Sequence, residues 1–461
     1  MGTKMRKLDV AIVGAGAAGI ACGMKLLDKG NHNFMIYEKG RSYEKRYCPV
    51  DHGRTCMKCD GICNVISGFG GCIHYGDSVK LSVYPSGKRL YQLLGPDAYY
   101  SCLEFALEHF FRNRYLEFQM TEGNKITEMD VKDYGICSLD SGQVKEALRN
   151  SFDYLESNQC ISLETVVKKI EKQEDGFFLT LQRTSGEETV YAAKVVIATG
   201  RDGVTWWKEM TGHLGVKAEP PVISLGFRFE MDKKYLTGIG ERHPDLKLRF
   251  VKGGRKFKTF CFCAGKKGGK LKGENYGDFT LLDGHILLDK DEESGFANFA
   301  LLMQLTHDRE RMTYSQVVSR YIARYKKLGG YSGMPVFQNY SSFRNREDGS
   351  EQNGTSLASA RPAAVWKLLE PEEHTMFCEV ADEIIRWIME FNGLHAGQIE
   401  EFGKKIYILG MEIESLWDTI CLDEAMMTTV DGLYVTGDCA GLAQGIIPAA
   451  VSGVYVAEKI V

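Results

Sequence analysis

A glycine-rich stretch near the start constrains the fold of this chain more than any other feature. Residues 14–19 read GAGAAG and directly follow the apolar run LDVAIV of residues 8–13. Such a run is typical of a buried parallel strand. The next residues, IACGMKLLDKG, have helical spacing and end at Gly30, and a second apolar run, FMIYE, ends at Glu38. A strand, a glycine loop, a helix, a strand and an acid in this order predict a dinucleotide-binding unit.

Each residue of this unit has a physical role. Gly14 allows the tight turn, Gly16 lets the backbone approach a pyrophosphate, and Gly19 permits close packing of helix on strand. The free N–H groups at the helix N-terminus favour an anion. Glu38 lies where an acid bonds a ribose hydroxyl.

Two later segments extend the same pattern. AAKVVIATGRDG (192–203) reads as another buried strand that closes on Thr199 and Gly200. GLYVTGDCAG (432–441) reads as a strand that ends at Gly437 and Asp438, and a helix is expected from about Pro448 to the last residue, since proline is favoured at a helix start. The N-terminus of that helix would offer partial positive charge to a reduced, anionic cofactor.

These motifs resemble the FAD-binding oxidoreductases of the glutathione-reductase-like superfamily. CPVDHGRTCMKCDGICNVISGFGG (48–71), FCFCAGKKGG (260–269), ANFALL (297–302) and PVFQ (335–338) are similar to one branch of it, the largely uncharacterised FAD-utilising dehydrogenases. The resemblance implies an α/β fold: a Rossmann-like FAD-binding domain with a central parallel sheet, and an inserted α+β substrate domain with an antiparallel sheet. The pattern also departs from the branch, because HYGDSVK (74–80) replaces its usual Ser-Asp-Gly-Lys stretch.

From the resemblance we expect FAD as cofactor and a flavin-dependent dehydrogenase or reductase. The chain has no second GxGxxG after a strand, so electrons would come from the substrate, from NADH or NADPH as a loosely docked donor, or from a partner protein. The expected FAD-binding residues are Gly14, Gly16, Ala17, Ala18, Gly19, Glu38, Lys39, Gly70, Gly71, Val167, Ala198, Thr199, Gly200, Gly437, Asp438, Gly445, Ile446 and Ile447.

The cysteine-rich stretch before the GFGG loop leaves three readings open. Cys48, Cys56, Cys59 and Cys63 offer the four thiolates that zinc or an iron–sulfur cluster requires. The Cys-x-x-Cys within it could instead exchange a disulfide with the flavin. The third reading is a set of thiols that only pack or line a loop.

Catalytic candidates follow the glycine loop and the Cys-x-Cys. His74, Tyr75 and Asp77 directly follow GFGG, where a proton donor would lie beside a flavin. Cys261 and Cys263 alternate on one expected strand and so face the same way. Three further polar residues are candidates to orient an anionic substrate: Arg228, Gln338 and Arg344.

Charge and composition limit the class of protein and its partners. The 461 residues carry a net charge of −4 and are 44% hydrophobic, as in an ordinary globular protein. Residues 246–273 nevertheless hold ten Lys or Arg and no acid, which suits an anionic substrate or carrier; RNA is the less favoured partner, and it motivates an RNA-modifying flavoenzyme as the second hypothesis. A non-catalytic FAD-binding protein is the third.

The patterning also predicts location and domain organisation. The start lacks a signal peptide pattern and no apolar run is long enough for a membrane span, so we expect a cytoplasmic protein with reduced thiols, no membrane association and no predicted oligomeric state. The FAD-binding domain is expected over 1–215 and 405–461. The substrate domain is expected over 216–404, with a loop at 346–356 that could act as a lid.

Overall fold

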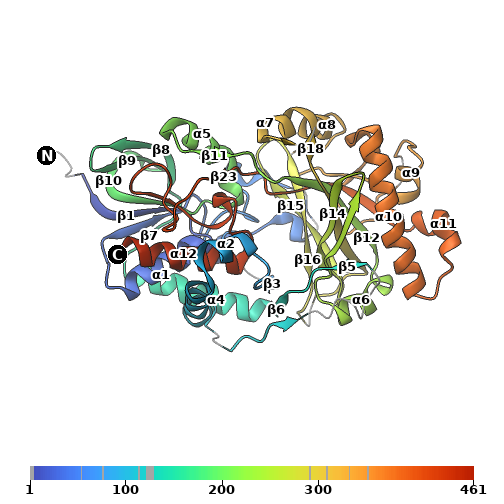
Figure 1. The fold of residues 1–461 in the computed structure, drawn as a ribbon, viewed down its shortest axis with the longest axis horizontal. Helices are drawn as coiled ribbons and strands as arrows, with labels where there is room; N and C mark the ends of the chain where they lie inside the picture. Colours follow the sequence, from blue (N-terminus) through green and yellow to red (C-terminus); the bar gives the residue numbers. More distant parts are fainter. Residues whose placement is uncertain are drawn as a thin grey trace.

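The computed structural model describes residues 5–52, 54, 56–74, 77–112, 115–120, 129–289, 292–307, 310–331, 333–349 and 352–461. Two large sheets lie side by side along the long axis, and both chain ends lie at the same end of the molecule (Figure 1). The predicted fold class is confirmed: one sheet has a parallel centre, and the other is almost wholly antiparallel.

The first sheet contains the predicted dinucleotide-binding strands. Its order is β7-β2-β1-β10-β9-β8, and β24 pairs with β10 outside this path. The pairs among β7, β2, β1, β10 and β24 are parallel, whereas β8 and β9 form an antiparallel extension. The bounds are β1 (Lys7–Val13), β2 (Phe34–Tyr37), β7 (Ile161–Ser162), β8 (Val166–Gln173), β9 (Gly176–Arg183), β10 (Gly186–Ile197) and β24 (Leu433–Val435).

Helices cover the parallel part of this sheet. α1 (Ala17–Asp28) and α12 (Ile446–Ile460) pack directly against each other. Their backbones approach closely at Gly453, where an added Cβ would lie 2.1 Å from the Ala18 carbonyl oxygen. α4 (Ser141–Ser157) contacts α1, and α5 (Val204–Leu214) lies over β8. One continuous apolar core therefore runs from the sheet into these helices.

The second sheet has eight strands in the order β21-β20-β22-β12-β17-β14-β13-β5. Its outer side is covered by α10 (Pro371–Phe391) together with α7, α8 and α9 (Figure 1). Stacked aromatic rings of Phe229, Phe299 and Phe377 fill the core between sheet and helices. The bounds are β5 (Asp130–Val131), β12 (Ser224–Asp232), β13 (Leu248–Lys252), β14 (Arg255–Cys263), β17 (Phe296–Gln304), β20 (Val336–Asn339), β21 (Arg361–Pro362) and β22 (Tyr407–Glu414).

Shorter elements join the two sheets. The hairpin β15 (Gly269–Asn275) and β16 (Thr280–Ile286) and the small sheet β3-β6-β4 lie at the junction. The remaining elements are β3 (Val79–Ser82), β4 (Gln119–Met120), β6 (Gly135–Leu139), β11 (Ala218–Glu219), β18 (Thr306–His307), β19 (Glu310–Arg311), β23 (Thr419–Ile420), α2 (Lys88–Leu94), α3 (Pro96–Phe105), α6 (Thr237–Arg242), α7 (Tyr314–Val317), α8 (Ala323–Lys327), α9 (Tyr340–Arg344), α11 (Ile399–Gly403), the π-helices η4 (Ala106–Phe110) and η8 (Val318–Ile322), and the 3₁₀ turns η1 (Tyr43–Lys45), η2 (Pro49–His52), η3 (Lys58–Gly61), η6 (Arg201–Gly203), η7 (Lys233–Tyr235), η9 (Val365–Leu368), η10 (Ala396–Gln398) and η11 (Gly437–Ala440).

Element ends follow the expected local chemistry, with a few shifts. Asp140 caps α4 through a capping box with Gln143. α12 begins at Ile446, two residues before Pro448, because proline also fits the third helical position, whose N–H has no partner in the helix. The predicted return to the first domain at residue 405 precedes β22, which lies inside the eight-stranded sheet; the chain rejoins the parallel sheet only at β24.

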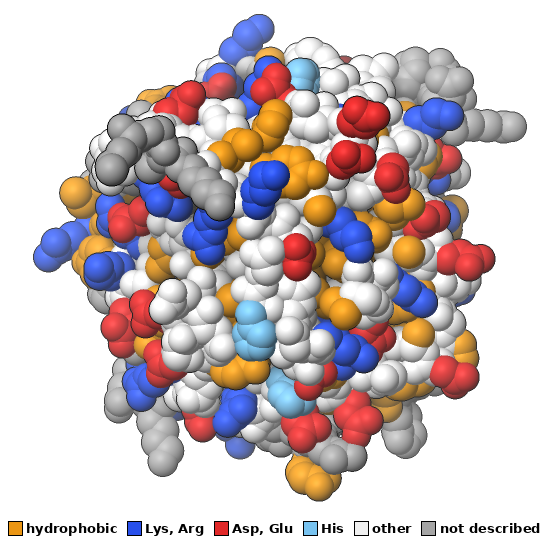
Figure 2. Space-filling model, turned by 90° about the vertical axis from the view of Figure 1, so that its left-hand side faces the viewer, with side chains coloured by type: hydrophobic (Ala, Val, Ile, Leu, Met, Phe, Trp, Pro, Cys, Tyr) orange, Lys and Arg blue, Asp and Glu red, His pale blue; other side chains and the backbone are white. Residues whose placement is uncertain are grey.

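The described residues contain no helix long and apolar enough to cross a membrane. On the face shown in Figure 2, acidic and basic side chains are interspersed and neither sign forms a continuous patch.

Candidate active site

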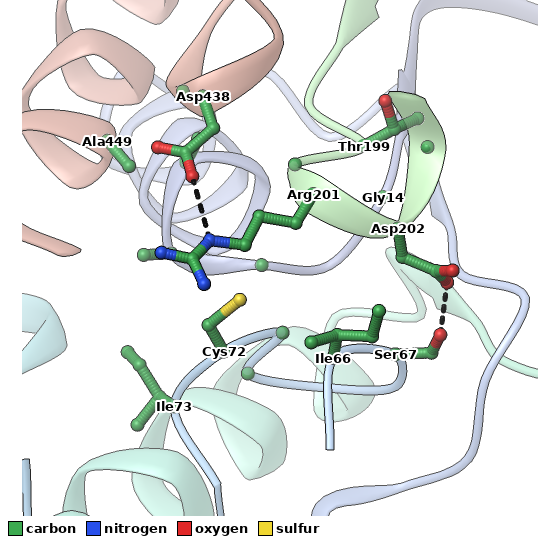
Figure 3. Close-up of a pocket in the computed structure, with 18 of the residues that line it drawn as sticks. Gly14, Ile66, Ser67, Cys72, Ile73, Thr199, Arg201, Asp202, Asp438 and Ala449 are labelled. Atoms are coloured by element: carbon green, nitrogen blue, oxygen red, sulfur yellow. Dashed lines mark hydrogen bonds and ion pairs between the residues drawn. The ribbon is translucent and has the colours of Figure 1, made fainter. Parts of the chain in front are cut away.

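A cavity of about 360 Å³ runs from the glycine loop to the junction of the two sheets. Its wall is built by the β1–α1 loop, the end of β2, loop 66–73, the loop after β10, strand β16 and the N-terminus of α12. Most of these segments lie at the carboxyl ends of parallel strands, where ligands bind in open α/β sheets. Figure 3 shows part of this wall, including Gly14, Ser67, Cys72, Arg201 and Asp438.

The three glycines of the GAGAAG loop meet different surroundings. Gly14 has φ +104°, and a Cβ there would lie 2.5 Å from the Ala198 carbonyl oxygen. A Cβ on Gly19 would lie 2.0 Å from the Gly14 carbonyl oxygen. At Gly16 the nearest atom is the Gly71 Cα at 3.9 Å, and Gly16 lines the cavity. Gly14 and Gly19 are therefore required by the fold itself, whereas Gly16 leaves open space toward the cavity.

Glu38 joins the two glycine-rich loops beside the cavity. Its Oε2 accepts the Ala15 N–H at 2.9 Å, and its Oε1 accepts the Gly40 and Gly68 N–H groups at 2.7 and 3.0 Å. The side chain is buried, yet it lines the cavity. An ionised carboxylate has about four acceptor positions, so Glu38 holds the loops in place and still has capacity for a hydroxyl donor.

The residues predicted to bind the cofactor converge on this cavity. All of them line it except Gly19 and Ile447, which pack behind the wall. The N–H groups of the first three residues of α1 have no helical acceptor, because the first helical bond runs from the Ile20 N–H to the Gly16 carbonyl, and α1 starts directly at the cavity. The same holds for α12, whose first helical bond runs from the Ala449 N–H to the Gly445 carbonyl; its N-cap Gly445 and its first residue Ile446 also line the cavity.

Arg201 reaches into the middle of the cavity, as Figure 3 shows. Its guanidinium lies 2.8 Å from Glu274 Oε1, 3.4 Å from Asp283 Oδ2 and 3.8 Å from Asp438 Oδ2. The Cys72 thiol lies beside this guanidinium. Burial raises the pKa of Asp438 and of Glu274, and Arg201 opposes both shifts. Arg201 thus ties three elements together at the point where the cavity meets the second sheet.

The end of the cavity at the junction of the two sheets is here called the inner end. Two thiols lie close together there. Cys261 lines the cavity, and its Sγ lies 3.5 Å from the Sγ of Cys263. The register between β14 and β17 shifts between Phe260 and Cys263, and Cys261 has φ +46°, which is rare for a residue other than glycine. The bulge therefore re-aims the two side chains.

The surroundings of the two thiols favour one thiolate. The hydrogen bond from the Cys263 thiol lowers the pKa of Cys261 in spite of burial, and the Lys80 ammonium acts in the same direction. Burial and the neighbouring Cys261 raise the pKa of Cys263. Lys80 lines the cavity and lies 2.9 Å from Asp245 Oδ1; burial alone would lower its pKa, but Asp245 outweighs burial and raises it. Lys80 therefore stays charged beside the thiols.

Arg228 lies behind the wall of the cavity. Its guanidinium is fully buried and pairs with Glu412 and, at 2.9 Å, with Asp283 Oδ1. It also donates to the Cys261 carbonyl at 2.9 Å and to Asn298 Oδ1 at 3.1 Å. These partners occupy the planar donor fork of the arginine. Arg228 therefore supports the wall at Cys261 and Asp283, and it does not reach the cavity space where a substrate would lie.

His74 and Asp77 form a buried cluster next to the cavity. His74 Nδ1 lies 2.7 Å from Asp77 Oδ2, and the Lys272 ammonium contacts Asp77 and lies 3.1 Å from Asp51 Oδ2. Burial lowers the pKa of His74, and Lys272 lowers it further. The Asp51, His74 and Asp77 ligand atoms lie within 4.8 Å of one another, and the ammonium groups of Lys272 and Lys270 already offset the two carboxylates. Tyr75, the third predicted residue here, lies outside the described residues.

Gln338 lies in β20 of the second sheet, and Arg344 lies in α9, which packs against that sheet. Gln338 is buried and donates to the Glu347 carbonyl at 2.7 Å. Arg344 pairs with Asp382 at 3.1 Å and with Glu400 at 3.5 Å. Neither is among the described residues that line the cavity.

Two cavity residues that sequence reasoning did not select carry unused polar atoms. In the described part of the chain, neither the Tyr37 hydroxyl nor His285 Nε2 has a hydrogen-bond partner, although both atoms are buried. Both residues line the cavity. Burial lowers the pKa of His285 to about 3, so its imidazole is neutral at pH 7. His285 belongs to no local motif and reaches the cavity only through tertiary packing, whereas Tyr37 directly precedes Glu38 in the strand FMIYE, and this place beside the motif is the signal that could have found it.

The basic segment 246–273 is largely paired with acids from other segments. Lys258 contacts Glu414, Arg255 lies 3.3 Å from Glu373, and Lys252 lies 3.0 Å from Glu379. Lys247, Lys266, Lys270 and Lys272 also have acidic partners. The local positive charge seen in the sequence is therefore offset across the sheet.

No protein-family model and no curated protein matches the chain. Among solved structures, the chain is similar to a flavoprotein/dehydrogenase from Cytophaga hutchinsonii at 12% identity and TM-score 0.39, covering 97% of this chain and 75% of that one. It is also similar to a geranylgeranyl bacteriochlorophyll reductase-like protein from Thermoplasma acidophilum at 11% identity and TM-score 0.42, covering 99% and 78%. Aklavinone-11 hydroxylase in complex with FAD and aklavinone matches at 12% identity and TM-score 0.39, covering 95% of this chain and 58% of that one. Function therefore has to be argued from the site itself.

Proposed function

We propose that this chain binds FAD in the cavity and catalyses the oxidation or reduction of an organic substrate at the cavity's inner end. One observation carries the proposal. A single cavity extends from an open glycine at a helix N-terminus, past a buried acid, to a thiol pair and a neutral imidazole between the two sheets. An elongated dinucleotide would occupy both ends of the cavity, and the redox reaction would take place at the end that holds the thiols and the imidazole.

The wall suits the parts of FAD. The N-terminus of α1 would hold the pyrophosphate through free N–H groups and the helix dipole. Glu38 would accept a ribose hydroxyl, and Thr165 to Val167 would flank the adenine end. At the other end, the N-terminus of α12 would face the flavin ring, with Asp438 near the ribityl chain. The unpartnered Tyr37 hydroxyl and His285 Nε2 fit a polar ligand that supplies their missing hydrogen bonds.

FAD, when bound, would accept or donate a hydride. The residues of the inner end would transfer protons and position the substrate. Cys261 lines the cavity, and the Cys263 thiol beside it keeps its proton and stabilises the Cys261 thiolate, so Cys261 can accept or return a proton at a pH below the pKa of an ordinary thiol. His285 stays neutral and can donate a hydrogen bond without adding charge. Arg228 is a positioning residue that holds the Cys261 carbonyl and Asp283.

The inner end also suggests the class of substrate. Lys80 and Arg201 bring two buried positive charges to the wall, while the apolar side chains of Ile66, Ile73 and Ile286 line the remaining surface. Carboxylates already pair with both cations, so a small or carrier-bound organic molecule with an apolar body is what matches this lining.

An absorption spectrum of protein purified without oxygen, before and after addition of NADH or NADPH, tests the proposal. We expect flavin bands in the purified protein. Bleaching by a nicotinamide would identify a reductase with a soluble donor. Unchanged bands would fit an enzyme whose electrons come from the substrate or a partner, and also a non-catalytic FAD-binding protein. Protein that binds no flavin, even after incubation with FAD, would overturn the proposal.

A further inference from the structure

A second, smaller cavity lies at the cysteine-rich stretch that precedes the GFGG loop in the sequence. Cysteine thiols make up much of its wall. The space is about 30 Å³, and all four cysteines of the stretch 48–63 line it: Cys48, Cys56, Cys59 and Cys63. Among the described residues of the stretch 48–63, the regular structure consists of two 3₁₀ turns, η2 and η3. The four thiols therefore converge although little regular secondary structure organises the segment.

Other elements close the cavity from the opposite side. Asn275 at the end of β15 and Thr280 at the start of β16 line it, as do Gly333 and Pro335. A Cβ on Gly333 would lie 2.4 Å from the Cys56 Cβ, so the backbone approaches the cysteine loop as closely as a glycine allows. The enclosure is thus built from four segments of the chain, at 48–64, 273–280, 333–335 and 357–359, which a loop of merely packing thiols does not require.

Polar hydrogens of Asn275 point at two of the sulfurs. The Asn275 backbone N–H lies 3.4 Å from Cys63 Sγ, and its side-chain amide lies 3.8 Å from Cys56 Sγ. Hydrogen bonds to sulfur stabilise the negative charge of metal-bound thiolates and tune iron–sulfur sites. None of the four cysteines is in a disulfide.

The spacing of the sulfurs distinguishes two kinds of metal centre. A single zinc ion at about 2.3 Å from each sulfur would bring its four ligands within roughly 4 Å of one another. Among the described residues, however, only Asp51, His74 and Asp77 form a group of three ligand atoms within 4.8 Å. The cysteines therefore surround a wider space than one zinc ion fills. In a cluster the thiolates bind different iron atoms, so their sulfurs lie further apart.

We propose that Cys48, Cys56, Cys59 and Cys63 bind an iron–sulfur cluster. Binding releases the four thiol protons, because the metal ligands are thiolates. The last ligand, Cys63, is three residues before Ile66, which lines the large cavity. The cluster would thus adjoin the redox site of the proposed oxidoreductase and give it a second electron carrier. Metal binding itself does not depend on flavin.

The test is the iron and acid-labile sulfide content of the full chain, purified without oxygen or reconstituted with ferrous iron and sulfide. We expect both elements in fixed ratio to protein and a broad absorption band that oxygen bleaches. Cys56→Ser combined with Cys59→Ser should lower iron and sulfide at least about tenfold. Cys421→Ser is the matched control, since Cys421 is exposed and lines neither cavity.

Flavin content measured on the same samples separates this site from the large cavity. We expect the double variant to keep its flavin, which also shows that it folds. Stoichiometric zinc without sulfide in wild-type protein would contradict a cluster. Four thiols that react freely with a thiol reagent in native protein, with no metal bound under either condition, would overturn the site altogether.

Discussion

The two ends of the large cavity are built by different means. At the glycine end, backbone groups and a single acid make the wall: Gly14, Gly16, the start of α1 and Glu38. At the inner end, buried charges and thiols from both sheets make it, among them Arg201, Asp283 and Cys261. The first end is local in sequence and fixed by sterics, and the second depends on long-range ion pairs. Substitutions at the two ends should therefore fail in different ways.

The largest loss of stability is expected when the buried charge of Arg228, behind the wall of the inner end, is removed. Arg228→Met leaves the buried Glu412 carboxylate without Arg228, while Asp283 keeps its ion pair with Arg201. Breaking a buried pair in this way costs about 3–5 kcal/mol of unfolding free energy, which urea denaturation measures. Lys367→Met is the control, because its ion pair with Asp348 is exposed and is worth about 0–1 kcal/mol. Equal losses in both variants would mean that Arg228 is not a structural ion pair.

In the second sheet, Glu230 should make the free energy of unfolding depend on pH. Burial raises the pKa of Glu230 to about 7, against about 4.5 when unfolded. Between these values the folded state binds more protons, so this group's contribution to stability is full below pH 4.5 and is lost as pH rises through 7. The contribution is about 3 kcal/mol. Subtracting the stability profile of Glu230→Gln from that of wild type should reveal this slope, since the other titrating groups cancel. A flat difference would contradict it.

At the glycine end we expect loss of binding without loss of folding. Gly16→Ala meets no protein atom closer than 3.9 Å, and its φ of −76° suits alanine, so stability should change by less than about 0.5 kcal/mol. The added methyl group would enter the space of the pyrophosphate and weaken FAD binding by about tenfold or more. Gly212→Ala, in α5 and away from the cavity, is the control. Unchanged FAD affinity in Gly16→Ala would place the pyrophosphate elsewhere.

The smallest effect is expected on the reactivity of the thiol pair Cys261 and Cys263. Removing the Cys263 hydrogen-bond donor in Cys263→Ala should raise the pKa of Cys261. Alkylation of Cys261 at pH 7 in protein without bound flavin should then slow several-fold, because only the thiolate reacts. Peptide mass spectrometry identifies the modified residue. An unchanged rate would show that Lys80, rather than Cys263, governs Cys261.

The sequence predicted the glycine end well because its determinants are contiguous. A strand, the GAGAAG loop, a helix and Glu38 lie within residues 7–38, and their geometry follows from local sterics. The role of Arg228 could not be read in this way. It was predicted to orient substrate, but its partner Glu412 is 184 residues away and β12 must first pair with β22. His285 was missed for the same reason, since β16 reaches the cavity only through tertiary packing, whereas Tyr37 lies inside the contiguous unit, directly before Glu38.

The cysteine stretch is intermediate between these cases. Its spacing suggested a metal site, but the same spacing also fitted packed thiols. Asn275 and Gly333, which complete the enclosure, come from β15 and from the loop before β20. Only the tertiary structure brings them to the cysteines.

The most direct measurement of the central claim is calorimetric titration of flavin-free protein with FAD, and separately with FMN. The cavity extends from Glu38 to Asp438, so an FAD molecule bound along it would contact the wall with both of its halves. We predict that FAD binds at one site per chain and at least about a hundredfold more tightly than FMN, which lacks the adenosine half. Equal affinity for the two flavins, or no binding of either, would contradict the account.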